Sequence, residues 1–171
     1  MSIADLEREA MLRKLEFVRS EVLYCLIQQS KFDMLPRDVQ ARSAAADDQT
    51  LRTIGVGVDD SSRDVYLFSS EVRLAAGIKV LQTKVPRFSR KPFRNVSSDA
   101  LLMLEAVKSF EPKSLTLDYG HKSELAVEPD KVRSLVRLAE IDRIANRDFF
   151  YVVEDAQGFA VTMELSGKTY A

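Results

Sequence analysis

Apolar patterns typical of helices and of strands alternate along this chain, but not in the strict strand–helix–strand order of a parallel α/β sheet. Helices are predicted at 3–18, 70–78, 98–111 and 129–146. Strands are predicted at 21–29, 51–58, 64–69, 114–119, 124–127, 149–153 and 159–165. The pairs 51–58 with 64–69 and 149–153 with 159–165 flank turn-forming residues and are predicted to be β-hairpins, which pair antiparallel. The predicted fold class is therefore α+β, with a mixed or antiparallel sheet, helices packed on it and a C-terminal β-hairpin.

The length of 171 residues suits a single α+β domain, 1–171. Residues 30–49 are small and polar, are interrupted by Pro36, and are predicted to form a mobile surface loop. The C-terminal hairpin is predicted over 149–165, and the residues after it are expected to fray. Five consecutive apolar residues at 149–153 indicate burial on both faces. The cover is either a helix of the same chain or a second subunit, so a homodimer is one alternative.

The chain carries no sign of a membrane or of an oxidising compartment. No stretch reaches the roughly 20 apolar residues that a transmembrane helix needs. The first residues, MSIADLEREAM, carry charges of both signs and lack the apolar core of a signal peptide. Cys25 is the one cysteine, so no intrachain disulfide can form. We therefore expect a cytoplasmic protein.

Few residues could carry catalysis. His121 is the single histidine and lies in a predicted turn, whereas Cys25 lies in an apolar run where a thiol is usually inert. One histidine and one cysteine cannot build a structural zinc site. Ser166-Gly167-Lys168-Thr169 resembles the end of a phosphate-binding loop, but Thr162 stands where that motif needs glycine. We expect no catalytic residues, no metal and no cofactor; an enzyme would need a deep pocket that joins His121 or Cys25 to a carboxylate.

The strongest positive signal is the segment 79–94 (KVLQTKVPRFSRKPFR), which holds six cations and no acidic residue. Cations on an extended, proline-containing chain can bind phosphates or the carboxylates of an acidic protein, and interleaved aromatic rings can stack on bases. The residues predicted to bind a partner are Lys84, Arg87, Phe88, Arg90, Lys91, Phe93 and Arg94. The alternative is a solvated connecting loop with Phe88 and Phe93 in the core. A net charge of −1 disfavours nucleic acid as the partner.

The order of elements over 64–136 resembles the N-terminal domain of the SseB (enhanced serine sensitivity) family. The strand and helix start of that family are matched by 65–74 (VYLFSSEVRL), and its helix rich in Leu and Ala by 101–110. Its next two strands are matched by 115–120 and 123–129, although the usual Asn-Pro-Gly-type turn is Asp-Tyr-Gly-His here. The resemblance implies a bacterial, cytoplasmic α+β module with a loose association with secretion systems. The family has no established reaction, so the resemblance transfers no catalytic residue.

These observations favour a non-enzymatic protein-interaction or regulatory module that binds a protein partner through 79–94. The alternative function is a phosphate- or nucleic-acid-binding domain that uses the same basic segment. Binding to polyanions that weakens steeply with salt would separate the two, because only the second releases many counterions.

Overall fold

The computed structural model describes residues 2–37, 40, 46–58, 62–90, 92–145, 163–165 and 168–170. Its centre is a five-stranded sheet in the order β3–β1–β2–β4–β5. The strands are β1 (Val22–Gln28), β2 (Asp64–Phe68), β3 (Phe93–Asp99), β4 (Ser114–Leu117) and β5 (Leu125–Val127). β1 pairs antiparallel with β2 and β3, β2 pairs parallel with β4, and β4 pairs antiparallel with β5. The sheet is therefore mixed, and the predicted α+β class is confirmed.

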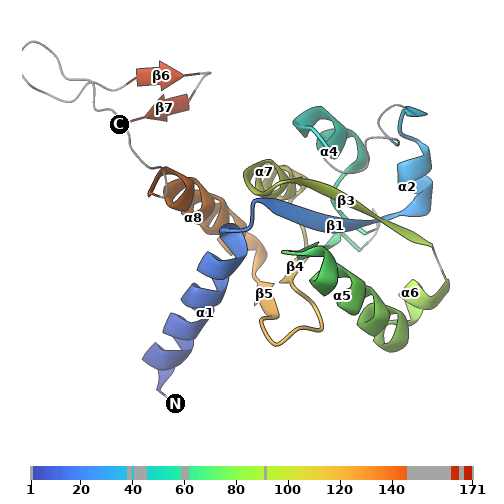
Figure 1. Cartoon of the computed structure of the whole chain (residues 1–171), viewed down its shortest axis with the longest axis horizontal. Helices are drawn as coiled ribbons and strands as arrows, with labels where there is room; N and C mark the ends of the chain where they lie inside the picture. Colours follow the sequence, from blue (N-terminus) through green and yellow to red (C-terminus); the bar gives the residue numbers. More distant parts are fainter. Residues whose placement is uncertain are drawn as a thin grey trace, which may run out of the picture.

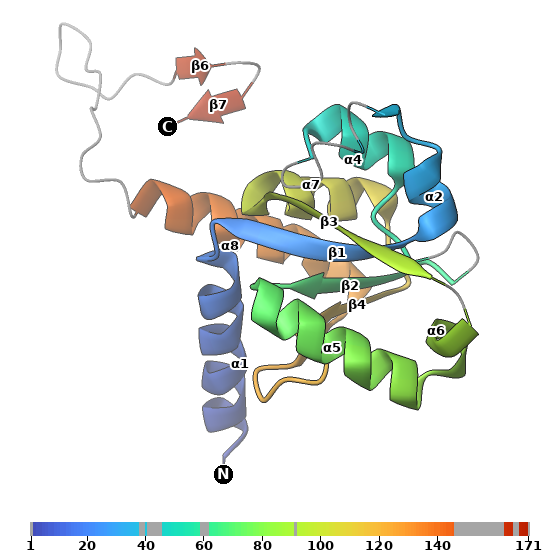
Figure 2. The same ribbon diagram turned by 45° about the vertical axis from the view of Figure 1, so that its right-hand side comes forward.

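Helices cover both faces of the sheet (Figure 2). α5 (Glu71–Lys84) and α6 (Pro86–Arg90) lie on one face, and α4 (Asp48–Ile54), α7 (Ala100–Phe110) and α8 (Val132–Ala145) lie on the other. Side chains of β1 alternate between the two cores, with Leu23, Cys25 and Ile27 in the larger one. Leu26 faces the smaller core beneath α5. This period of two is what a strand buried on both faces requires.

The shorter elements complete the described chain. α1 (Ile3–Val18) precedes β1, α2 (Gln29–Asp33) follows it, and a 3-10 turn (Pro129–Lys131) leads into α8. α1 begins with a capping box, in which the Ser2 side chain accepts from the Asp5 amide and the Asp5 carboxylate accepts from the Ser2 amide. In the part of the chain that the structure describes, no helix is both long enough and apolar enough to cross a bilayer.

The prediction of a long loop at 30–49 and a strand at 51–58 was wrong. α2 begins at Gln29 and covers the start of the first range, and α4 occupies the end of the first and the start of the second. Asp47 caps α4 by accepting from the Thr50 amide, and Leu51 and Ile54 bury the same side of the helix. Over the described residues, 51–58 contains no strand to form the predicted hairpin with β2, which pairs with β1 and β4.

The segment 79–94, which was expected to be an extended chain or a connecting loop, is helical in its first part. α5 continues to Lys84 because Leu81 lies two turns beyond Leu74 and is buried on the same side. Pro86 then begins α6, at the helix position that proline favours. The next helix, α7, was predicted to begin at 98, but it is capped by Asp99, because Ser98 is buried in β3.

The predicted C-terminal hairpin of 149–153 with 159–165 lies outside the described residues, apart from 163–165. There, β6 (Met163–Leu165) pairs antiparallel with β7 (Lys168–Tyr170). The end of the chain, which was predicted to fray, thus forms a strand.

Candidate functional site

α1 projects beyond the sheet and its covering helices. Figures 1 and 2 show it leaving one side of the molecule, with the N-terminus at its free end. The buried residues of α1 are Phe17 and Val18, both at its C-terminal end. Ile3 is 78% exposed, and Leu6, Met11 and Leu12 are exposed as well. The apolar arc of this amphipathic helix therefore continues beyond the sheet and the helices that cover its last turn.

The exposed arc of α1 belongs to a concentration of apolar side chains on two neighbouring helices. Ten large apolar side chains are exposed among the described residues, and six of them lie on α1 and α8. The two on α8 are Ile141 and Ile144. Asp142 between them accepts from Arg19 of the α1 C-cap at 2.9 Å, so the two helices meet there. The four on α1 lie at residues 3–12, away from this contact at the C-terminal end of the helix, so the candidate interaction surface is the first half of α1.

A buried ion pair fixes the direction of α1. Arg73 of α5 donates to Asp118, which follows β4, at 2.7 Å and to Glu16 of α1 at 2.9 Å. Asp118 is 2% exposed and also accepts from the Ser69 amide at 2.8 Å and from the Ser69 hydroxyl. Partial burial alone would lower the pKa of Arg73, but the hydrogen bonds to Glu16 and Asp118 outweigh it and raise that pKa. The network joins the ends of two parallel strands to the helix that projects.

A further bond ties α1 to the β5 side of the sheet. Arg13 donates to the carbonyl oxygen of Glu124 at 3.4 Å. Together with the bonds of Arg19 and Arg73, it anchors the second half of α1 to three different elements. The first half is thereby presented in a fixed direction.

The aromatic residues predicted to bind a partner lie mainly inside the molecule. Phe88 is 2% exposed, and its ring stacks on that of Phe93 with a centroid distance of 4.5 Å. The ring of Tyr66 meets Phe88 edge-on at 5.6 Å. Phe88 and Phe93 thus help to fill the small core beneath α5, and Phe88 has no free ring face to offer a base.

The predicted cations are distributed over α5, α6 and β3. Lys84 is exposed on α5, and Arg94 is exposed on β3, where it donates to Gln29 at 2.7 Å. Arg87 pairs with Asp64 at 2.5 Å. Arg90 lies at the end of α6, whereas Lys91 lies outside the described residues.

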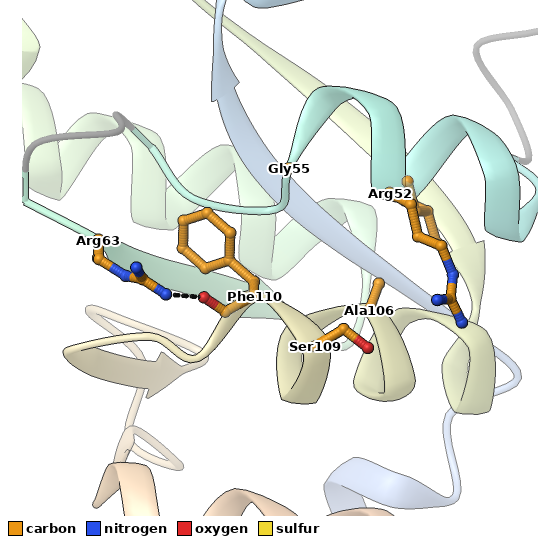
Figure 3. A pocket seen from close by; sticks show the side chains of 7 residues that line it. Arg52, Gly55, Arg63, Ala106, Ser109 and Phe110 are labelled. Carbon is orange, nitrogen blue, oxygen red and sulfur yellow. Dashed lines mark hydrogen bonds between the residues drawn. The ribbon is translucent and has the colours of Figure 1, made fainter.

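A groove of about 490 Å³ lies between α4 and α7 (Figure 3). It is lined by Leu51, Arg52, Gly55, Arg63, Ala106, Ser109 and Phe110. Arg63 donates to the carbonyl oxygens of Phe110 and Glu111 and so caps the C-terminal end of α7. The titratable groups among these lining residues are two arginines, which supply neither a general base nor a nucleophile. The groove therefore supports no acid–base mechanism.

The two reactive residues considered from the sequence lie apart from this groove. His121 lies in a turn, with Nδ1 2.6 Å from the hydroxyl of Ser123. Cys25 is fully buried in β1, and this burial raises the pKa of its thiol to about 12. Among the described residues, no group of three or more His, Cys, Asp or Glu side chains could hold a metal ion.

The projecting arc was partly visible in the sequence. Its apolar spacing predicted a helix. The spacing does not show that the sheet and its covering helices leave the first half of this helix uncovered. The Arg73–Asp118 pair carried no sequence signal, because its members are far apart along the chain. No family model matches this sequence, and neither the curated proteins nor the solved structures provide a significant match. The candidate site is therefore argued from geometry alone: an anchored helix with an uncovered apolar arc.

Proposed function

We propose that this protein is a non-enzymatic protein-interaction domain that binds its partner through the projecting half of α1. The observation that carries the proposal is the uncovered apolar arc of Ile3, Leu6 and Met11 on an anchored helix, beside which Leu12 is exposed on the next side of α1. A helix of this length is marginal in water unless its apolar face packs on something. Covering a large aliphatic side chain contributes about 1.5–3 kcal/mol, so a partner that covers the arc of Ile3, Leu6 and Met11 gains a substantial driving force.

The exposed cations of the 79–94 segment are a second candidate surface. Lys79 and Lys84 are exposed on α5, and Arg94 is exposed on β3. Their proposed ligand is an acidic protein surface, and the alternative remains a phosphate or nucleic acid. The burial of Phe88 favours the acidic protein, because base stacking needs an accessible ring.

Membership of the SseB family, a bacterial cytoplasmic location and an association with secretion systems remain part of this proposal. The sequence resemblance supports them, and no matching family model adds to that support.

The proposal is tested by affinity capture with the full chain, followed by binding measurements with the purified partner. The variant carries Met11→Glu and Leu12→Glu, which change exposed side chains and should leave folding intact. Its matched control is Met34→Glu at the C-cap of α2, a helix that lies on the opposite side of the molecule from α1 (Figure 1); Met34 is 84% exposed. We expect the α1 variant to bind at least about tenfold more weakly and the control to bind like the wild type. Equal binding by all three proteins would refute the proposal.

A further inference from the structure

We infer that the partner of α1 is a second copy of this chain, whose own α1 packs against it in the antiparallel direction. This inference rests on the proposed function and goes beyond it by naming the occupant. The charges of α1 support this inference, because they are distributed so that two copies of the helix in antiparallel orientation bring opposite charges together.

The two halves of α1 carry opposite charge. Residues 3–9 hold three carboxylates (Asp5, Glu7 and Glu9) and one arginine, a net charge of −2. Residues 10–19 hold three cations (Arg13, Lys14 and Arg19) and one glutamate, a net charge of +2. An antiparallel copy brings the acidic half of each helix to the basic half of the other, whereas a parallel copy brings like charges together.

Three of these charges, Glu7, Arg8 and the half-buried Lys14, have no salt bridge among the described residues, and Arg8 faces away from the side that Glu7 and Lys14 share. Glu9 pairs with Arg13 within α1, Glu16 pairs with Arg73, and Arg19 pairs with Asp142. Asp5 is engaged in the capping box. Glu7 and Lys14 are two helical turns apart and face the same side of α1.

In a dimer with two-fold symmetry, each contact between two different residues forms twice. In an isologous dimer, a contact of Glu7 with Lys14 of the second copy is repeated by Lys14 with Glu7. Ala10 and Met11 then lie between these two pairs along the helix, and Ile3 and Leu6 lie beyond them. Ala10 lies near the middle of the helix, where a small side chain allows the two backbones to approach closely.

The size of the surface sets the expected strength. The projecting residues 3–12 extend over roughly 15 Å of helix, and a contact of this length buries less than the roughly 1,200 Å² of a standard stable interface. The dimer should therefore be weak and reversible, with a Kd on the order of 10 μM.

The test is sedimentation velocity of the full chain between about 1 and 300 μM, a range chosen to span that Kd. Glu7→Lys and Lys14→Glu are each expected to raise the Kd about tenfold, because each turns two attractive contacts into repulsive ones. The double variant restores both pairs with their signs exchanged, so its Kd should return close to the wild-type value. Met11→Glu with Leu12→Glu should abolish the dimer, and Met34→Glu should leave it unchanged.

Two results would overturn the inference. One is a wild-type protein that stays monomeric throughout the concentration range. The other is a dimer that the α1 variants do not weaken, or whose single-charge defects the double variant fails to repair. A monomeric protein that still binds a different protein through Met11 and Leu12 would overturn the dimer and leave the proposed interaction function standing.

Discussion

Replacing Asp118 with asparagine should destabilise the fold and loosen the anchorage of α1. Asp118 has a φ of 48°, in the left-handed region, which asparagine tolerates about as well as aspartate. The substitution also keeps the size of the side chain. It therefore tests the carboxylate charge and its second oxygen with little change to the backbone.

The expected magnitude follows from the partners of the carboxylate. One oxygen accepts from the Ser69 amide, and the other accepts from Arg73 and from the Ser69 hydroxyl. An asparagine has one acceptor oxygen, so its NH₂ group must face a donor on one of the two sides. Breaking a buried ion pair in this way costs about 3 kcal/mol. By contrast, Glu16→Gln breaks an exposed pair with Arg73 and should cost less than about 1 kcal/mol.

Urea denaturation and thermal unfolding of the two variants measure this difference. For a chain of this size, a loss of 3 kcal/mol lowers the Tm by about 6–12 °C. A double-mutant cycle of Asp118→Asn with Arg73→Gln should show a coupling larger than that of Glu16→Gln with Arg73→Gln. If Asp118→Asn unfolds within about 0.5 kcal/mol of the wild type, the reasoning on the buried pair is refuted.

Three further predictions concern other parts of the fold. Gly77→Ala should destabilise the protein by about 1–3 kcal/mol despite the higher helix propensity of alanine, because the new Cβ would lie 2.3 Å from the buried ring of Phe68; a rise in the unfolding midpoint would contradict this. Burial raises the pKa values of Asp64 and Asp99, but hydrogen bonds outweigh it and the net pKa of each is lowered. These two groups therefore stabilise the fold above the ordinary pKa of 3.8 and lose that contribution as the pH falls through their lower folded values. Asp99→Asn keeps a capping oxygen and should flatten the acid limb of stability against pH; an unchanged acid limb would argue against the assignment. Finally, the buried thiol of Cys25 should resist thiol reagents in native protein at neutral pH and react on unfolding, as followed by absorbance; rapid labelling of the native protein would show that β1 opens.

Those elements whose local signals agree could be predicted from the sequence. α1 has both an apolar period and the Ser2 cap, and α5, predicted to begin at 70, begins at Glu71 after the Ser70 cap. The strand over 21–29 was predicted from β-branched and aromatic residues and corresponds to β1. In each case, propensity and periodicity point to the structure that tertiary packing also favours.

Where the local sequence pattern fitted both a helix and a strand, tertiary packing determined which of the two forms. The run 51–58 is short and apolar, a pattern that fits a strand or a buried helix equally well. The cap supplied by Asp47 and the fit of Leu51 against α7 select the helix. The cations of 79–94 suggested an exposed loop. The surface of a helix or an edge strand exposes cations equally well, and these cations lie on such elements.

The candidate site depends on distances that no local pattern contains. The apolar arc of α1 could be recognised in the sequence. Whether it is exposed depends on how far the sheet and its covering helices extend along α1. The ion pair of Arg73 with Asp118 depends on β2 and β4 lying side by side, which no spacing in the sequence indicates.

The strand pairing of the sheet governs when this chain can fold during synthesis. β1 pairs with β3 in the register Val22 to Asp99, and β2 pairs with β4 in the register Asp64 to Ser114. Within the five-stranded sheet, β1 with β2 and β4 with β5 are consecutive strands that also lie side by side, whereas β1 with β3 and β2 with β4 are separated by other strands along the chain. Contacts between such distant segments make folding slow. A ribosome must therefore deliver β4 before the two central strands gain all their partners, and until then their apolar edges are open to aggregation.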